Sequence, residues 1–253
     1  MIHAVQLMEF RLSVRSLDDA NLPITREWRN SARLMRVGQA ILPGQAFLSY
    51  SWLAPEHRVS PETTTDCDDT RHLLNHTQGP RAEPAPSVDT QTEEAHQWMA
   101  AMAETCSLLD GILAIVHPSQ FDAARDMLGR VVATSGIGSI ESLWPSVYHA
   151  VQLVINRETL YHRDVHGRPG WLDMLVTLGT YGERALLALR NLGVGLTYDA
   201  GTVVMIDDRL VVHGVPPTPG DRICYAFFMN RHVMDYSHVY FPDWTFLPEA
   251  LRP

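Results

Sequence analysis

The spacing of apolar residues changes along this chain, from a helical period after residue 90 to short β-type runs after residue 147. In the first part, apolar side chains recur every three or four positions, which predicts an amphipathic helix; they are Trp98, Met102, Cys106 and Leu109. Thr90, three residues before Glu93, is the candidate for a capping box at the start of this helix. The apolar run 111–116 then predicts a buried strand, and Pro118 predicts the start of a second helix.

Short runs rich in β-branched and aromatic residues follow, separated by Gly, Pro and Asp. They predict strands over 147–155, 171–178, 186–189, 202–206, 210–215 and 223–229. Strands this short and this closely spaced are typical of a jelly roll or a small barrel. The pattern therefore predicts an α+β fold in which helices pack on one sheet of a β-rich core.

Residues 54–91 interrupt this pattern. The segment is dense in Pro, Thr, Ser, Asp and His and has little periodic apolar content, so burial cannot offset the entropy lost on ordering it. We interpret it as a loop or a partly disordered insert. It separates an N-terminal lobe, 1–53, in which 47–53 could form a strand, from a main domain over 92–253.

Length and composition favour one main domain in a reducing compartment. The chain has 253 residues with 45% hydrophobic content, enough for one well-filled domain. No apolar run approaches the roughly 18 to 20 residues that span a bilayer, and the N-terminus lacks the layout of a signal peptide, so we expect an intracellular protein without a membrane partner. The 3 cysteines lack CxxC spacing, which argues against a disulfide framework or a zinc knuckle.

The charge balance bears on possible partners. A formal net charge of -9 gives no general attraction to phosphate backbones, so binding to nucleic acid would need a local basic groove on an acidic body. All 20 basic residues are arginines, the side chain best suited to forked contacts with carboxylates and phosphates. Biased codon usage explains this bias more simply than function does.

Three dispersed residues, His162, Asp164 and His213, could bind one metal ion. A ferrous oxygenase needs two imidazoles and one carboxylate on one face of an octahedron, with the other positions left for a chelating co-substrate and O2. On an extended segment, residues at i and i+2 point to the same side, so His162 and Asp164 could hold one ion. His213 follows Asp164 by 49 residues, a separation that returns the chain beside the first site in a double-stranded β-helix.

Arg222 lies nine residues after His213 and leads into an apolar strand, where an unpaired charge would be costly. Its guanidinium could bind the far carboxylate of 2-oxoglutarate while the keto-acid end chelates the iron. Taken singly, His213 is more often a core residue and Arg222 a surface ion-pair residue, so the ordered set carries the hypothesis. Zinc hydrolysis is the main rival chemistry, but no HExxH, P-loop, GxGxxG or GxSxG motif is present.

Four segments resemble the TET/JBP-like dioxygenases, especially their fungal branch: 156–164 (NRETLYHRD), 171–179 (WLDMLVTLG), 201–204 (GTVV) and 220–226 (GDRICYA). The resemblance spans roughly residues 111–233. It implies a double-stranded β-helix core, dependence on Fe(2+), 2-oxoglutarate and O2, and oxidation of the methyl group of 5-methylcytosine, or of thymine, in DNA. It also implies that His162, Asp164 and His213 bind the iron and that Arg222 binds 2-oxoglutarate.

Asn156 and Asn230 are candidate substrate contacts in this resemblance. His166, two residues after Asp164, could contact the metal ligands or the substrate, and an exposed loop histidine is the alternative interpretation. Where the wider family often has a polar residue three positions after the ligand Asp, this chain has Gly167, and where a base-contacting His can follow the anchoring Arg by eight positions it has Asn230. A small metabolite or an N-methylated base such as N6-methyladenine is therefore an alternative substrate, and a non-enzymatic relic is a third hypothesis. A DNA substrate implies a nuclear location; the sequence does not determine the oligomeric state.

Overall fold

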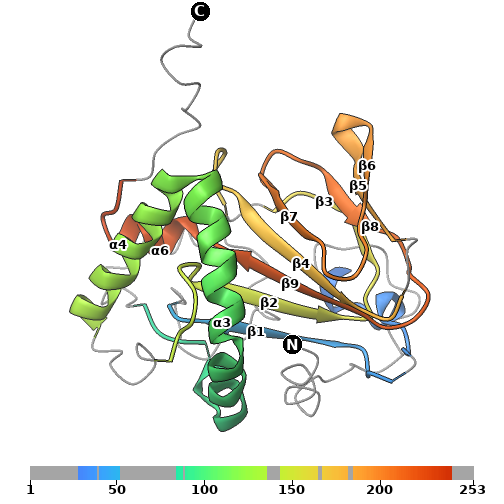
Figure 1. The fold of residues 1–253 in the computed structure, drawn as a ribbon, viewed down its shortest axis with the longest axis horizontal. Helices are drawn as coiled ribbons and strands as arrows, with labels where there is room; N and C mark the ends of the chain where they lie inside the picture. The colour runs from blue at the N-terminus through green and yellow to red at the C-terminus, as the bar shows by residue number, and fades with distance from the viewer. Residues whose placement is uncertain are drawn as a thin grey trace, which may run out of the picture.

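Segments that are far apart in the sequence form two antiparallel sheets in the computed structural model of the protein (Figure 1). The structure describes residues 28–38, 40–51, 84–87, 89–135, 143–164, 167–181 and 185–240. The larger sheet has five strands in the order β1-β2-β9-β4-β7, and the smaller has four in the order β3-β8-β5-β6. Within these residues the protein thus combines helices with two separate antiparallel sheets rather than one closed barrel.

The observed strands follow the predicted β-rich runs closely. Their bounds are β1 Gly44–Ser49, β2 Ala150–Ile155, β3 Thr159–His162, β4 Asp173–Gly179, β5 Leu186–Leu189, β6 Val194–Thr197, β7 Val203–Ile206, β8 His213–Val215 and β9 Arg222–Phe228. Every predicted strand except 111–116 overlaps one of them, whereas β3 and β6 lie outside the predicted ranges. β1 comes from the predicted N-terminal lobe and pairs with β2 at the edge of the five-stranded sheet.

The predicted strand at 111–116 is wrong, because these residues form the last turns of helix α3, Glu93–Val116. Leu113 is fully buried and continues the apolar face of Cys106 and Leu109 at helical spacing. The helix ends just before Pro118, which opens helix α4, Pro118–Ser135, as predicted. A short apolar run does not by itself distinguish a buried strand from the end of a buried helix.

The predicted capping box at Thr90 is also wrong. Thr92 is the N-cap of α3, and its side chain accepts a hydrogen bond from the backbone N–H of Ala95. Thr90 lies in the short 3-10 helix η5, Asp89–Gln91, and its hydroxyl accepts a hydrogen bond of 2.9 Å from the backbone N–H of Ser49. Thr90 therefore joins the start of the helical region to β1 instead of capping the helix.

A helix and a strand over 111–116 predict different exposures for the side chains at positions 113 and 115. In a strand, positions 113 and 115 would share one face, but in α3 Leu113 is fully buried while Ile115 is 83% exposed. We therefore expect Leu113→Ala to lower the free energy of unfolding by about 2 to 5 kcal/mol and Ile115→Ala to change it by less than about 0.5 kcal/mol. Urea unfolding of both variants measures this difference, and equal losses would contradict the helix.

The five-stranded sheet has two different faces. Helices α3 and α4 cover one face, as Figure 1 shows, and the main apolar core lies between them and the sheet; its members include Trp98, Met102, Leu153, Met174 and Tyr225. A second core joins the other face to the four-stranded sheet and contains Leu175, Leu187, Tyr198, Ile206 and Val215. Residues that alternate along β9 therefore point in turn to the helices and to the space between the sheets.

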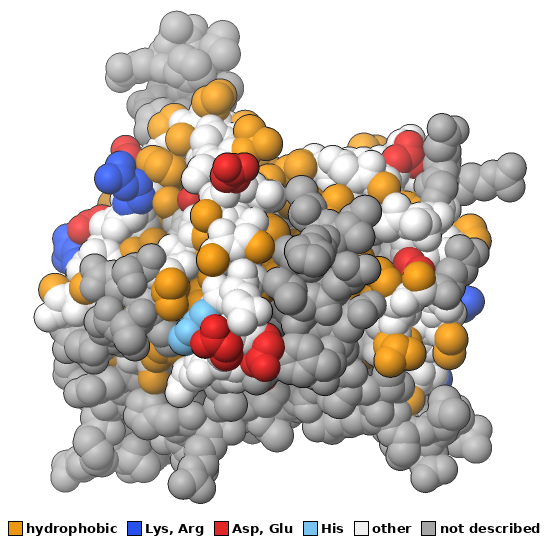
Figure 2. Space-filling model, turned by 60° about the horizontal axis from the view of Figure 1, so that its bottom comes forward, with side chains coloured by type: hydrophobic (Ala, Val, Ile, Leu, Met, Phe, Trp, Pro, Cys, Tyr) orange, Lys and Arg blue, Asp and Glu red, His pale blue; other side chains and the backbone are white. Residues whose placement is uncertain are grey.

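Helix α3, with 24 residues, is long and apolar enough by composition to cross a membrane, contrary to the sequence-based expectation that no such segment exists. The core helix of a soluble protein passes the same test, and α3 packs its apolar face, including Trp98 and Met102, into the main core. On the described part of the face in Figure 2, apolar side chains are scattered among polar and acidic ones. Helix α3 thus packs one face into the main core, while 28% of its most apolar window is buried.

Parts of the sequence-based predictions fall on residues outside the described ranges. Most of the predicted insert, 54–91, belongs to them, as do His166 and Cys67. Of the remaining cysteines, Cys106 is buried and Cys224 is partly buried, and both are free thiols. The last described helix, α6, spans Arg231–Tyr236 and was not predicted.

Candidate metal centre

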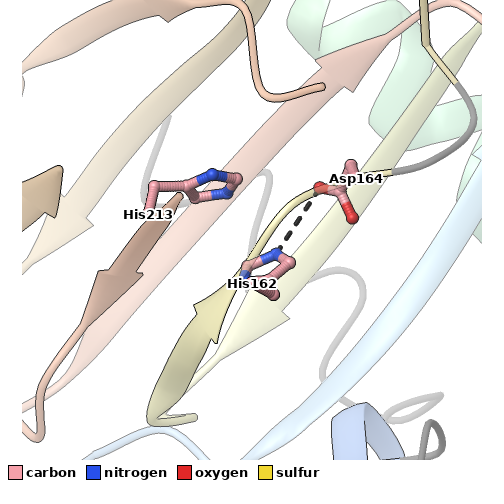
Figure 3. A group of neighbouring side chains, drawn as sticks. All are labelled: His162, Asp164 and His213. Carbon is pink, nitrogen blue, oxygen red and sulfur yellow. Dashed lines mark ion pairs between the residues drawn. The ribbon is translucent and has the colours of Figure 1, made fainter. Parts of the chain in front are cut away.

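His162, Asp164 and His213 come together at one edge of the four-stranded sheet (Figure 3). His162 is the last residue of β3, and His213, the first residue of β8, is its direct partner across the antiparallel pair. Asp164 follows two residues after His162, and its backbone N–H donates to the carbonyl of Asp208, 3.0 Å away. One potential ligand atom from each of the three residues lies within 4.8 Å of the others.

Hydrogen bonds to the backbone orient both imidazoles in the same way. Nδ1 of His162 lies 2.8 Å from the carbonyl oxygen of Leu160, and Nδ1 of His213 lies 3.0 Å from that of Val211. A carbonyl oxygen can only accept, so each Nδ1 carries the proton and donates it. Each Nε2 is then left with a lone pair for a metal ion, the arrangement that metal-binding histidines usually show.

The surroundings of Asp164 and His213 favour the protonation states that a metal ion requires of these two residues. Burial by itself raises the pKa of Asp164, but the charges of His162 and Arg29 hold that pKa well below its usual range. Burial lowers the pKa of His213, and the adjacent His162 lowers it further. At neutral pH the group thus presents an ionised carboxylate and, at His213, a neutral imidazole.

Two more carboxyl groups lie behind Asp164. Burial raises the pKa of Asp208 well above its usual range, and the neighbouring charges of Asp173 and Asp164 raise it further. Burial likewise raises the pKa of Asp173 to about 7. A protonated Asp208 has one O–H, which it can donate to either Asp164 or Asp173, the two side chains with which it interacts. Sequence reasoning missed this pair, because nothing in the spacing of Asp173 and Asp208 indicates that they meet.

Arg222 opens β9 and is buried, with 3% of its surface exposed. Its Nη2 donates to the carbonyl oxygen of Arg157 over 2.9 Å. Among the described residues, no carboxylate forms an ion pair with Arg222 in the structure. A buried guanidinium without a protein counter-ion is costly, so a bound anion would stabilise it.

A second buried arginine, Arg157, lies next to Arg222 and was not singled out from the sequence. Its Nη1 donates to Oε1 of Gln45 over 2.9 Å, while its buried Nε has no hydrogen-bond partner among the residues that the structure describes. Burial, together with the charges of Arg29 and Arg222, lowers the pKa of Arg157 to about 9. The concentration of positive charge beside the His-Asp-His group suits an anionic ligand.

Two of the candidate substrate contacts, Asn156 and Asn230, form hydrogen bonds within the protein. Asn156 has a φ of 52°; its Oδ1 accepts from the backbone N–H of Arg222 over 2.8 Å, and its Nδ2 donates to Oδ1 of Asp221 over 2.9 Å. Asn230 is the N-cap of α6, where its Oδ1 accepts from the N–H of His232. Asn156 therefore positions the backbone of Arg222.

Trp28 and Arg29 also contact the group, from the 3-10 helix η3, Trp28–Asn30. Arg29 forms an ion pair with Asp164, and the ring of Trp28 meets that of His162 edge-on at a centroid distance of 5.0 Å. More than 130 residues separate these partners along the chain. No local sequence pattern could have indicated the contacts, because they depend on how the N-terminal segment folds back.

The donor set fits a ferrous ion, because two imidazole nitrogens and one carboxylate leave positions open for a chelating co-substrate and O2. The class defined by this site is that of non-haem iron oxygenases. Residues 72–231, more than half of the chain, match the family model described as the oxygenase domain of the 2OGFeDO superfamily, Tet_JBP. The chain belongs to this family and is a dioxygenase that depends on Fe(2+) and 2-oxoglutarate.

Comparison with individual proteins adds little to the family assignment. No curated protein sequence matches this chain. Among solved structures, the chain is similar to NgTET1, determined in complex with 5mC DNA, with 14% sequence identity and a TM-score of 0.47. The similarity covers 64% of this chain and 59% of that one, so the chain spans less than two thirds of the length of NgTET1.

Proposed function

We propose that this dioxygenase oxidises the methyl group of 5-methylcytosine, or of a related methylated base, in DNA. The observation that carries the proposal is the convergence of His162, Asp164 and His213, with the buried guanidinium of Arg222 beside Arg157. The family assignment supports the reaction class. The base itself is inferred from the resemblance of segments such as 156–164 and 220–226 to TET/JBP-like enzymes.

In this proposal, His162, Asp164 and His213 bind the ferrous ion through Nε2, a carboxylate oxygen and Nε2. When bound, the ion activates O2 and couples decarboxylation of 2-oxoglutarate to succinate and CO2 with hydroxylation of the substrate methyl group. Arg222 binds the far carboxylate of 2-oxoglutarate with two parallel hydrogen bonds, because a guanidinium matches a carboxylate in this geometry. Asn156 holds the backbone of Arg222 in register through its bond to the Arg222 N–H.

The remaining parts of the proposal concern the fold and the setting. The two antiparallel sheets are the halves of a double-stranded β-helix, and residues 92–253 are the dioxygenase domain. The methylated base leaves the DNA stack to reach the site, at a cost of a few kcal/mol. Asn156, His166 and Asn230 are the proposed substrate contacts. A nuclear location follows from a DNA substrate.

The substrate is tested by incubating the purified protein with Fe(2+), 2-oxoglutarate, ascorbate and duplex DNA that contains 5-methylcytosine. We expect 5-hydroxymethylcytosine in the nucleoside digest by mass spectrometry, and succinate in equal amount. A duplex with N6-methyladenine and an unmethylated duplex serve as matched substrates. Succinate that forms without oxidised cytosine on any duplex would contradict the proposed base and favour a small metabolite.

A further inference from the structure

The N-terminal segment around Trp28 and Arg29 lies outside the residues that match the family model, 72–231, yet it reaches the candidate metal ligands. Arg29 donates from Nη2 to Oδ1 of Asp164. Trp28 is 8% exposed, and its ring packs against the His162 ring at an interplanar angle of 66°. The side chains of two of the three candidate ligands, His162 and Asp164, thus contact adjacent residues of η3.

Arg157 contacts both the segment around Trp28 and Arg29 and the buried Arg222. Its Nη1 donates to the carbonyl oxygen of Arg29 over 3.2 Å, and its guanidinium carbon lies 5.3 Å from the centroid of the Trp28 ring. The guanidinium carbon of Arg29 lies 4.9 Å from that same centroid. Cation–π contacts at these distances stabilise the three side chains as a unit. Trp28 is therefore held in place by both arginines.

We propose that Arg29 and Trp28 are positioning residues of the metal centre. This inference rests on the proposed ligand roles of His162 and Asp164. Nη2 of Arg29 donates to Oδ1 of Asp164, whereas Oδ2 of the same carboxylate lies 3.5 Å from Nε2 of His162. The ion pair thereby fixes the carboxylate rotamer with one oxygen turned toward the imidazole nitrogen that binds the ion. Packing of the Trp28 ring against the His162 ring likewise restrains the orientation of that imidazole.

Arg29 has two opposite effects on metal affinity: it orients the Asp164 carboxylate, and its positive charge repels the metal ion. A terminal carboxylate torsion is broad when nothing restrains it, so losing the ion pair would let the Asp164 oxygens rotate away from the metal position. A cation near a divalent ion also repels it. The side chains of Arg29 and Asp164 are 32% and 34% exposed, so water screens this repulsion. We therefore expect orientation to dominate and metal affinity to fall when Arg29 is removed.

The test is a titration of the full chain with Co²⁺ by isothermal titration calorimetry, together with the visible absorption spectrum of the bound ion. We expect Arg29→Met to weaken Co²⁺ binding by about 10- to 100-fold, the usual effect of losing a residue that orients a ligand. Arg29→Lys keeps one charged donor and should restore part of the affinity. Trp28→Leu should weaken binding and change the spectrum.

Arg33→Met is the matched control, because Arg33 is an exposed arginine in the next 3-10 helix, η4, Ala32–Leu34. It should bind Co²⁺ like the wild type. Thermal unfolding without metal shows whether each variant is folded. If folded Arg29→Met binds Co²⁺ as tightly as the wild type, or more tightly, the positioning role is wrong. If His213→Ala also binds normally, the ligand assignment itself is wrong, so the two failures are distinguishable.

Discussion

Replacing His213 with alanine is expected to abolish 2-oxoglutarate turnover. Losing an orienting residue near a metal typically costs 10- to 100-fold in affinity or activity, and losing one of three protein ligands should cost more than about 100-fold. His213 is the ligand candidate from the second strand of the pair, so its removal leaves only the two ligands next to each other in sequence. Succinate formation by mass spectrometry and Co²⁺ affinity measure the loss together.

His238→Ala provides the matched control, since His238 is exposed and lies after α6, outside the group of three. It should keep wild-type turnover and metal binding. A folded His213→Ala variant that still binds Co²⁺ tightly and forms succinate would show that the metal is held elsewhere. The thermal stability of the metal-free variant decides whether a loss comes from misfolding.

Arg222→Leu is expected to weaken 2-oxoglutarate binding without removing the metal site. Removing one partner of a buried, hydrogen-bonded charge pair costs about 2 to 5 kcal/mol, which is about 30-fold or more in affinity. The KM for 2-oxoglutarate should rise accordingly, whereas Co²⁺ affinity in the absence of 2-oxoglutarate should stay within about threefold of wild type because Arg222 is not a ligand. Steady-state kinetics and calorimetry separate the two effects.

Two further variants sharpen this experiment. Arg222→Lys keeps the charge but loses the forked geometry, so its KM should lie between those of the wild type and Arg222→Leu. Arg130→Leu removes an exposed arginine that pairs with Asp126 on α4, and exposed pairs contribute little, so it should leave the KM unchanged. An unchanged KM in folded Arg222→Leu would exclude Arg222 as the 2-oxoglutarate contact.

The strands and the ligand candidates were predictable because they depend on local patterns. β-branched runs between turn residues indicated the strand around 223–229, and the i, i+2 spacing on extended chain indicated that His162 and Asp164 face one side. The error at 111–116 has a local cause as well. An apolar run of six residues fits either a buried strand or the buried end of a helix, and only the packing of Leu113 distinguishes them.

The surroundings of the ligands were not predictable. The side chain of Asn156 bonds to Asp221 and to the backbone of Arg222, partners that lie 65 and 66 residues away, and nothing in the local sequence indicates these contacts. Arg157 gives no sequence signal that separates it from the other arginines. Arg157 adds positive charge next to Arg222 because its guanidinium is buried there. The pairing of β2 with β9 brings the two arginines together.

The sequence by itself determined helices α3 and α4 in part, most of the strands that follow them, the residue types of the metal centre and the family. These properties are encoded in local periodicity and in the conjunction of His162, Asp164, His213 and Arg222. The tertiary structure alone decided that His162 faces His213, that both Nδ1 atoms are bound to backbone carbonyls, and that Trp28 and Arg29 rest on the ligands. Such contacts join residues far apart in the chain, and their geometry follows from packing that no local spacing encodes.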